Sequence, residues 1–427
     1  MTNTRIRISS LLLAISGLLT PHAAAFGAGK APKTHELTFS GKATPEQYYV
    51  PVYTSFTVPE GIVKISVTQH LGSGEARPGN LDLGIFDERG AGFEGPGFRG
   101  WSGGARRSFE IGETEATPGY LAGRINPGRW TVIQMPTTAG RTTDWTLKIT
   151  LTEGPRAKKL PAPSYAAPQL NDKPGWYRIA PHVHTVHSDG RLTPAEVIAL
   201  GKASGLDGIV STDHNTTSAL LHWGEVQDPE FLVINGVEVT YGQGHWNIFG
   251  LDPHAWIDFR IHHNDTLRYR KAVAKARKAG RLLVANHPYN LDFLYDVTPM
   301  DGIEVWNGRA DRKNPQANAM ACALAQRTAK PVTAGSDAHL PEEIGNGVVT
   351  LEADALTLPA VRAALLRGAT AVDGRRGKAR YVAESQLTKR RRTHAGAAAY
   401  VKWALFAAKC CLQDITWKGE TYHVLDR

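Results

Sequence analysis

Short apolar runs separated by turn residues fill the chain between residues 34 and 151. Several of these runs partly alternate apolar and polar residues, which is the two-residue period of a half-buried strand. Clusters of Pro, Gly, Asn and Glu, as at 59–61 and 126–128, separate the runs. The pattern predicts strands at 47–52, 62–67, 81–86, 130–133 and 145–149. Short strands at this spacing predict a β-sandwich-like domain over 34–152, for which we expect a positioning or lid-like role.

The pattern changes after a Pro- and Ala-rich linker at 153–175. From residue 176 onward, short apolar strands alternate with amphipathic helices, one of which begins with Thr193 as N-cap, Pro194 and Glu196. The predicted strands are 176–180, 208–212, 232–234, 282–285, 303–306 and 331–334, and the predicted helices are 193–205, 266–279 and 317–328. This alternation indicates an α/β domain over 176–383 with a parallel sheet, open or closed into a barrel.

Residues 384–427 do not fit the barrel pattern and are expected to form a loosely attached basic tail. The Ala-rich segment 397–412 is a candidate amphipathic helix, too short to cross a membrane. Lys402 and Lys409 lie seven residues apart and share one of its faces. The tail is therefore a candidate for peripheral contact with an anionic membrane surface.

The first 25 residues have the pattern of a secretory signal peptide. Arg5 and Arg7 precede an apolar run at 11–19, and three alanines at 23–25 provide a small-residue cleavage site. We expect export to the periplasm or the extracellular space, with a mature chain that begins near Phe26.

Charge and cysteine content exclude two other classes of protein. The segment from Arg375 to Lys402 carries nine basic residues and a single acid, which accounts for +8 of the net charge of +9. The rest of the chain is nearly neutral and offers no basic groove, so no nucleic-acid partner is expected. The three cysteines, Cys322, Cys410 and Cys411, imply neither a disulfide framework nor a thiolate metal site.

Histidines and carboxylates follow the predicted barrel strands where each strand ends. His182 and His184 close the first strand with their side chains on one face. Eleven of the sixteen histidines fall between His182 and His339. The candidate metal ligands in chain order are His182, His184, Asp189, His214, Glu238, His245, His287, Asp337 and His339. Because the carboxyl ends of barrel strands meet at one rim, these side chains are expected to converge on one metal centre.

The order of these motifs resembles that of the PHP (polymerase and histidinol phosphatase) superfamily. It runs His-x-His, Ser-Asp-Gly, Thr-Asp-His, Gly-x-Glu, His, Asn-His-Pro and Ser-Asp-x-His over about 175–380. The resemblance implies a distorted seven-stranded β/α barrel that holds two or three divalent metal ions. An amidohydrolase barrel also opens with His-x-His, but it bridges its metals with a lysine where this chain has Glu238. The β-rich N-terminal part, the export signal and the segment 244–250 are similar to the secreted CehA/McbA branch.

The resemblance also assigns the ligands to individual ions. His182, His184, Glu238 and Asp337 would hold the first ion, and Glu238 would bridge to a second ion held with His245 and His287. Asp189, His214 and His339 would hold a third. His182, Glu238 and Asp337 are the expected catalytic residues, and mixed imidazole and carboxylate ligation suits Zn, Mn or Fe. Asp213 and Asn286 adjoin ligands and either orient them or cap turns.

This site predicts a metal-dependent hydrolase that acts on a small-molecule ester, foremost a phosphoester attacked by a metal-bridging hydroxide. Asn307 and Arg309 at another strand end are candidate substrate contacts. Hydrolysis of a carbamate or carboxylic ester is the alternative that the CehA/McbA similarity implies. A non-catalytic exported protein that binds metal or carbohydrate is the third interpretation. The oligomeric state stays open.

Overall fold

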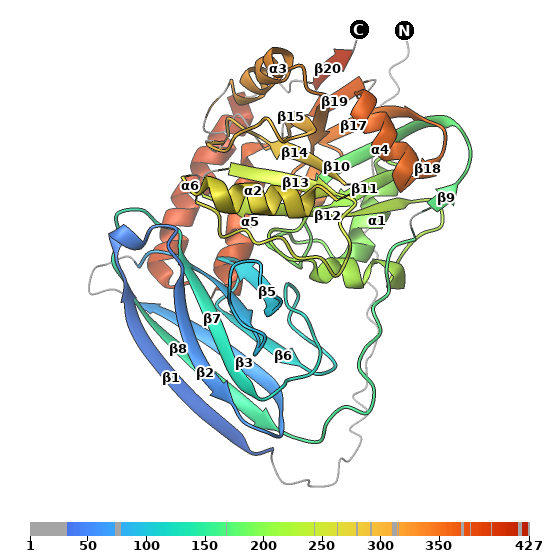
Figure 1. The fold of residues 1–427 in the computed structure, drawn as a ribbon. Coiled ribbons are helices and arrows are strands. Elements are labelled where there is room, and N and C mark those ends of the chain that lie inside the picture. The colour runs from blue at the N-terminus through green and yellow to red at the C-terminus, as the bar shows by residue number, and fades with distance from the viewer. Residues whose placement is uncertain are drawn as a thin grey trace, which may run out of the picture.

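The computed structural model describes residues 32–72, 78–167, 169–242, 244–262, 264–278, 281–290, 293–309, 314, 316–368, 371–375, 377–393, 395–416 and 421–425. An N-terminal β-domain lies beside a barrel-like sheet flanked by helices, and two C-terminal helices reach along both (Figure 1). The predicted signal peptide at 1–25 lies outside the described residues.

The N-terminal domain consists of two four-stranded antiparallel sheets, as predicted. The first sheet has the order β1 (Thr34–Ala43), β8 (Thr143–Glu153), β3 (Ile62–Gly72), β6 (Ser108–Gly112). The second has the order β2 (Val52–Val58), β7 (Gly128–Pro136), β4 (Leu81–Phe86), β5 (Phe98–Gly103). Alternate side chains of both sheets are buried between them, among them Phe109 and Trp130.

The predicted strand at 47–52 is wrong. Pro45–Gln47 form a 3-10 turn, η1, in which the Gln47 side chain accepts a hydrogen bond from the Thr44 backbone N–H at 2.9 Å. Tyr49 then adopts a φ of 56°, so the extended strand β2 begins only at Val52. Local capping by Thr44 and Pro45 therefore outweighs the β propensity of the tyrosines and valines that follow.

A single ten-stranded mixed sheet forms the second domain, with β16, β15, β14, β13, β12, β11, β10, β17, β19 and β20 side by side. Their bounds are β10 Gly175–Val183, β11 Gly208–Ser211, β12 Leu232–Tyr241, β13 Gly244–Phe249, β14 Leu282–Asn286, β15 Gly302–Asn307, β16 Val332–Gly335, β17 Gly347–Ala353, β19 Ala371–Arg375 and β20 Thr421–Leu425. A small separate sheet pairs β9 (Gln169–Asn171) with β18 (Leu356–Thr357).

The sheet curls into a nearly closed barrel. The residues after β16 return to the end of β10, where Asp337 N–H donates to the His182 carbonyl and His184 N–H to the Ala338 carbonyl, both at 3.0 Å. The predicted barrel is present, but its sheet is mixed and not parallel throughout: β13 runs antiparallel to both β12 and β14, and β17 runs antiparallel to both β10 and β19. Only two residues separate β12 from β13 in the sequence, and so short a link permits a hairpin but no parallel crossover.

Helices cover the outside of the barrel (Figure 1). They are α1 (Pro194–Ala203), α2 (Thr266–Ala276), α3 (Ala317–Thr328) and α4 (Leu358–Arg367), with 3-10 turns η2 (Ser218–Leu221), η3 (Trp223–Glu225) and η4 (Pro341–Glu343). The start of α1 is as predicted, since Thr193 and Glu196 form a capping box. Helix α2 ends at Ala276, three residues before the predicted end.

The C-terminal segment is not the loosely attached tail that we expected. Helices α5 (Ala379–Arg392) and α6 (Ala397–Thr416) pack against each other and against the barrel. The boundary placed at residue 384 therefore falls inside α5. Among the described residues, no helix combines the length and apolar character needed to span a membrane.

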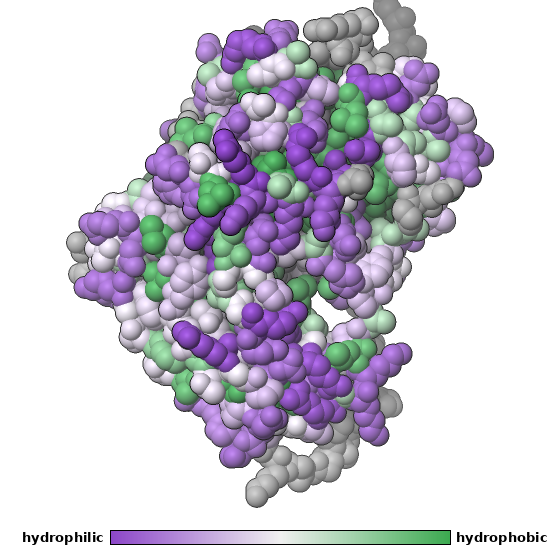
Figure 2. Space-filling view, in the orientation of Figure 1, coloured by the Kyte–Doolittle hydropathy of each residue, from purple (hydrophilic) through white to green (hydrophobic). Residues whose placement is uncertain are grey.

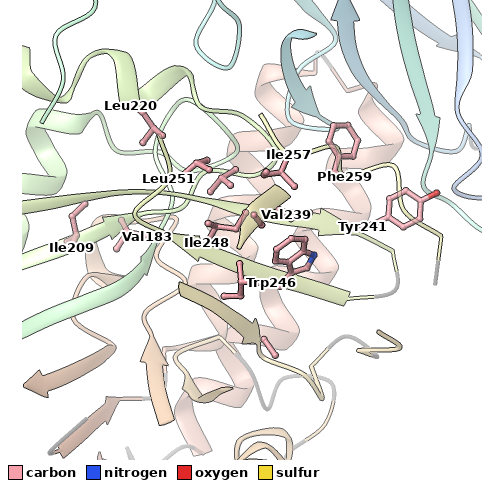
Figure 3. Close-up of a cluster of buried hydrophobic side chains, with 14 of the residues drawn as sticks. Val183, Ile209, Leu220, Val239, Tyr241, Trp246, Ile248, Leu251, Ile257 and Phe259 are labelled. Atoms are coloured by element: carbon pink, nitrogen blue, oxygen red, sulfur yellow. The ribbon is translucent and has the colours of Figure 1, made fainter. Parts of the chain in front are cut away.

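One of the hydrophobic cores extends across the boundary between the two domains, and Figure 3 shows part of it. Phe98 of β5 stacks on Trp256 with ring centroids 4.5 Å apart, and Trp101 contacts Phe259 at 4.5 Å. The buried Arg260 guanidinium donates to the Ala91 carbonyl at 2.9 Å across the same boundary. By contrast, the face seen in Figure 2 is mostly hydrophilic over both domains. The N-terminal domain is thus fixed against the barrel by buried contacts.

Candidate metal centre

His182 lies at the end of strand β10 and His184 directly follows it, and both are fully buried. The loop that follows carries Asp189 and is held by Asp213, which lies two residues after the neighbouring strand β11. The Asp213 carboxylate accepts hydrogen bonds from Thr185 N–H at 2.8 Å, from Thr185 Oγ1 at 2.7 Å and from Ser188 Oγ at 2.5 Å. Asp213 therefore fixes the loop after β10 and is not itself one of the candidate metal ligands.

Glu238 of β12 lies at the centre of the cluster and is fully buried. Five imidazoles surround its carboxylate, with nitrogen–oxygen distances of 2.8 Å to His214, 3.1 Å to His245, 3.2 Å to His287, 3.4 Å to His182 and 3.5 Å to His184. Asn286 donates from Nδ2 to the same carboxylate at 2.9 Å, so this amide orients it. A carboxylate placed among so many imidazoles has the position that a bridging ligand requires.

Asp337 and His339 complete the cluster from the loop after β16. Asp337 Oδ1 lies 3.3 Å from His184 Nε2, and Asp337 adopts a φ of 49°. His339 Nε2 lies 3.1 Å from Asp189 Oδ1, and His214 Nε2 lies 3.6 Å from the same oxygen. All nine predicted ligands thus converge on one end of the barrel.

The donor atoms form overlapping groups, each within the 4.8 Å spread that one ion can span. The groups are His184, Asp189, His214 and His339; His182, His184 and Glu238; His214, Glu238 and His245; and His182, His287 and Glu304. In addition, the Nε2 atoms of His182 and His184 face each other at 3.1 Å in the buried interior. A proton or a metal cation shared by the two nitrogens satisfies both of them. The donor set therefore fits divalent metal ions.

Glu304 of β15 is the residue that the sequence reasoning missed. Its Oε1 lies 2.8 Å from His182 Nδ1, and its Oε2 accepts the His287 backbone N–H at 2.7 Å. A carboxylate that holds the far nitrogen of a ligating imidazole fixes the ring and its tautomer. The available signal was a lone acid in an otherwise uncharged, fully buried strand.

The two predicted substrate contacts differ in position. Asn307 is buried and donates from Nδ2 to Glu304 at 3.1 Å, so it belongs to the network behind the ligands. Arg309 lines the cavity above the cluster, where its guanidinium lies 3.0 Å from Glu343 and donates to Ser385 Oγ at 2.8 Å. Of these two residues, only Arg309 lines the cavity in which a substrate would lie.

The charges of the cluster depend on one another. Burial opposes the ionised form of Glu238, but the imidazoles of His182, His214 and His245 outweigh it and hold its pKa well below the usual value. Burial also opposes the charged form of His214, yet the carboxylates of Glu238 and Asp189 raise its pKa to about 9. For His184, burial and the neighbouring imidazoles lower the pKa to about 4. The buried carboxylates therefore need positive charge beside them, from protons or from metal ions.

A cavity of about 660 Å³ opens over the cluster. Its floor is formed by Asp189, His214, His245, His287, Asp337 and His339, and helices α5 and α6 contribute the opposite wall. His182, His184 and Glu238 lie beneath this floor, since they are fully buried. A substrate in the cavity would thus meet the outer ligands directly.

One family model matches part of the barrel domain. A family model described as PHP-associated (PHP_C) matches residues 315–370, which include Asp337 and His339. No curated protein matches the chain. The order of the ligands and the matched segment make the barrel domain PHP-like.

Solved structures with low similarity include a two-domain protein from Bacteroides vulgatus that contains a predicted PHP-like metal-dependent phosphoesterase. It is 22% identical over 51% of this chain and 69% of its own, with a TM-score of 0.37. An amidohydrolase from Chromobacterium violaceum is 20% identical over 39% of this chain and 89% of its own, with a TM-score of 0.30. Such distant likenesses do not bear on activity.

Proposed function

We propose that the protein is a metal-dependent hydrolase whose substrates are phosphoesters. The observation that carries the proposal is the convergence of nine imidazole and carboxylate side chains, with Glu238 at their centre, at the floor of a cavity of substrate size. Such a mixed set binds Zn, Mn or Fe and leaves coordination positions open, as a catalytic site requires.

Divalent ions, when bound, would supply Lewis acidity toward a phosphoryl oxygen and would activate water for attack. The chain itself provides the rest. Glu238 and Asp337 hold negative charge at the base of the site, and Glu304 and Asn286 keep His182 and Glu238 in place. Arg309, which pairs with Glu343, lines the cavity above them. Phosphoesters fit best because their anionic oxygens suit a site that concentrates positive charge.

Turnover of a phosphomonoester and a phosphodiester by purified protein of known metal content tests the proposal. We expect Glu238→Gln and His182→Ala to abolish turnover while circular dichroism stays native, because each removes an innermost ligand. Unchanged turnover in either variant would contradict the assignment, and absence of any turnover from metal-loaded protein would favour a non-catalytic binding protein.

A carbamate or carboxylic ester hydrolase of the CehA/McbA type is the second candidate. The observation that favours it is the apolar part of the cavity wall, where Val382 and Phe406 can contact an uncharged aryl group. An aryl carbamate assayed beside the phosphoesters separates the two candidates, since the preferred substrate has the higher kcat/KM.

Export and membrane contact are further proposals. Mass spectrometry of the mature protein tests cleavage before Phe26. For membrane contact, α6 exposes Val401, Leu405 and Leu412 along one face, with exposed fractions of 62%, 70% and 65%. Sedimentation with anionic vesicles tests it, and binding should weaken in Leu405→Gln if this face inserts.

A further inference from the structure

Helices α5 and α6 form a hairpin that is tied together along its length. Trp403 Nε1 donates to the Ala383 carbonyl at 2.6 Å. At the far end, the Asp414 carboxylate accepts the Ala379 backbone N–H at 2.7 Å and so caps the first turn of α5. Figure 1 shows the two helices side by side. The hairpin therefore behaves as one unit.

This hairpin is also anchored beside the metal centre. Arg392 of α5 donates from Nη2 to the Gly190 carbonyl at 3.0 Å, in the loop that carries Asp189. Ser385 of α5 accepts a hydrogen bond from Arg309 at 2.8 Å. These contacts fix the wall that the hairpin presents to the cavity over the ligands.

That wall combines an apolar patch with two lysines. Val382 and Phe406 supply apolar surface, and Lys389 of α5 and Lys409 of α6 line the same cavity. The floor opposite consists of the outer metal ligands. A ligand whose ester group lies on the floor would therefore extend its leaving group toward Phe406 and the two lysines.

Two other charged side chains of this wall already have partners within the protein. Arg309 pairs with Glu343 at 3.0 Å, and Asp414 caps α5. Neither Lys389 nor Lys409 forms an ion pair with any residue in the described part of the chain. Lys389 also faces the half-buried Asp82 of the N-terminal domain, without forming an ion pair with it. Two cations of this cavity are thus available to a ligand.

We propose that Lys389 and Lys409 form a subsite for a second anionic group, so that the preferred substrate is a phosphoester whose apolar leaving group carries a carboxylate or phosphate at its far end. The inference rests on the proposed function and narrows its substrate class. Lysine suits this role because its ammonium is a point charge on a flexible stem, which follows anions of varied shape.

A matched pair of substrates tests the subsite: phenyl phosphate and 4-carboxyphenyl phosphate. The ratio of their kcat/KM values reports the contribution of the carboxylate alone. We expect the wild type to prefer the carboxylate by about tenfold, because each solvent-accessible charge pair contributes only modestly. The double variant Lys389→Met with Lys409→Met should lower the ratio to about one.

Lys402→Met is the matched control, since Lys402 lies on α6 but lines a different cavity. Its ratio should equal that of the wild type. Binding of phenylphosphonate and 4-carboxyphenylphosphonate, measured by calorimetry, provides a second readout that needs no turnover. The carboxylate should tighten binding in the wild type and in Lys402→Met but not in the double variant.

The outcomes separate the two proposals. Hydrolysis of both esters with a ratio near one, or a ratio that the double variant leaves unchanged, would overturn the subsite and leave the phosphoesterase standing. Lysine-dependent phosphonate binding without hydrolysis of either ester would support the subsite and count against the phosphoesterase. Neither hydrolysis nor a difference in phosphonate binding would overturn both.

Discussion

The Nδ1 atom of His182 and the Oε1 atom of Glu304 lie 2.8 Å apart in the fully buried interior between β10 and β15. The same carboxylate accepts the His287 backbone N–H, so one residue orients two ligands. It is the only acid of its strand, and its place behind the ligands explains why a charge is buried there.

Glu304→Ala should weaken metal binding about 10- to 100-fold, the range found when an outer-shell partner of a ligating histidine is removed. Turnover at saturating metal should fall less than metal affinity does. Competition with a chromophoric chelator measures the metal affinity. Glu304→Gln keeps the shape of the side chain and one hydrogen-bond acceptor, so it should lose less metal affinity than Glu304→Ala. Equal affinity in all three proteins would contradict this role.

The loop that carries Asp189 is held from the N-terminal domain as well. Arg106, between β5 and β6, donates to the Ser188 carbonyl at 3.1 Å and to the Val186 carbonyl at 2.6 Å. Arg106→Gln should therefore selectively weaken the ion held by Asp189, His214 and His339, and metal analysis should show up to one equivalent less than the wild type. Arg107→Gln is the control, because Arg107 lines a cavity away from this loop.

Stability of the metal-free protein should depend on pH in a defined window. The pKa of His214 is raised to about 9, so its contribution is fully present below about pH 6.5 and is lost as pH rises through 9. The pKa of Glu238 is depressed, so its contribution is present above about pH 4.5 and is lost only in stronger acid. Chelator-treated protein should thus melt at a lower temperature at pH 9.5 than at pH 6. His214→Gln should flatten that decline, and a melting temperature that rises over this window would contradict the account.

The two domains should unfold together because they share a core. Arg260 is buried, pairs with the buried Asp258 and donates to two carbonyls of the N-terminal domain. Arg260→Ala leaves the Asp258 charge without its partner and should cost about 3–5 kcal/mol in the free energy of unfolding. Denaturation followed by fluorescence and by circular dichroism should give one shared transition in the wild type. Two separate transitions there would show that the domains are independent.

Much of the metal centre could be predicted from the sequence because most of the ligands lie at or just after the end of a strand, and the topology of a barrel gathers strand ends at one rim. Glu238 lies inside β12 and His245 lies at the start of β13, which runs antiparallel to β12 and so brings His245 to the same rim. His182, Glu238 and Asp337 are separated by many residues, yet the barrel topology brings them together. Glu304 was not predicted because it contacts the far nitrogen of a ligating histidine, and this contact depends on how β15 lies relative to β10, which no local pattern shows.

The docking of the C-terminal hairpin could not be predicted from the sequence for a different reason. Its Ala-rich second helix and the run of basic residues at 389–392 resemble a solvated tail when considered locally. Long-range hydrogen bonds hold the hairpin against the barrel, such as those from Arg392 to the Gly190 carbonyl and from Arg309 to Ser385. No local sequence pattern predicts such contacts. The short link between β12 and β13 likewise accounts for the antiparallel direction of β13, while β17 and β19 add further antiparallel pairs at the other end of the sheet.

Elemental analysis of purified wild-type protein beside Glu238→Gln tests the central claim most directly, since the account rests on side chains that share cations around Glu238. We predict two or three equivalents of Zn, Mn or Fe in the wild type and at least one equivalent less in a natively folded Glu238→Gln. A wild type that retains no divalent metal after equilibration with these ions, or a variant with the same content, would contradict it.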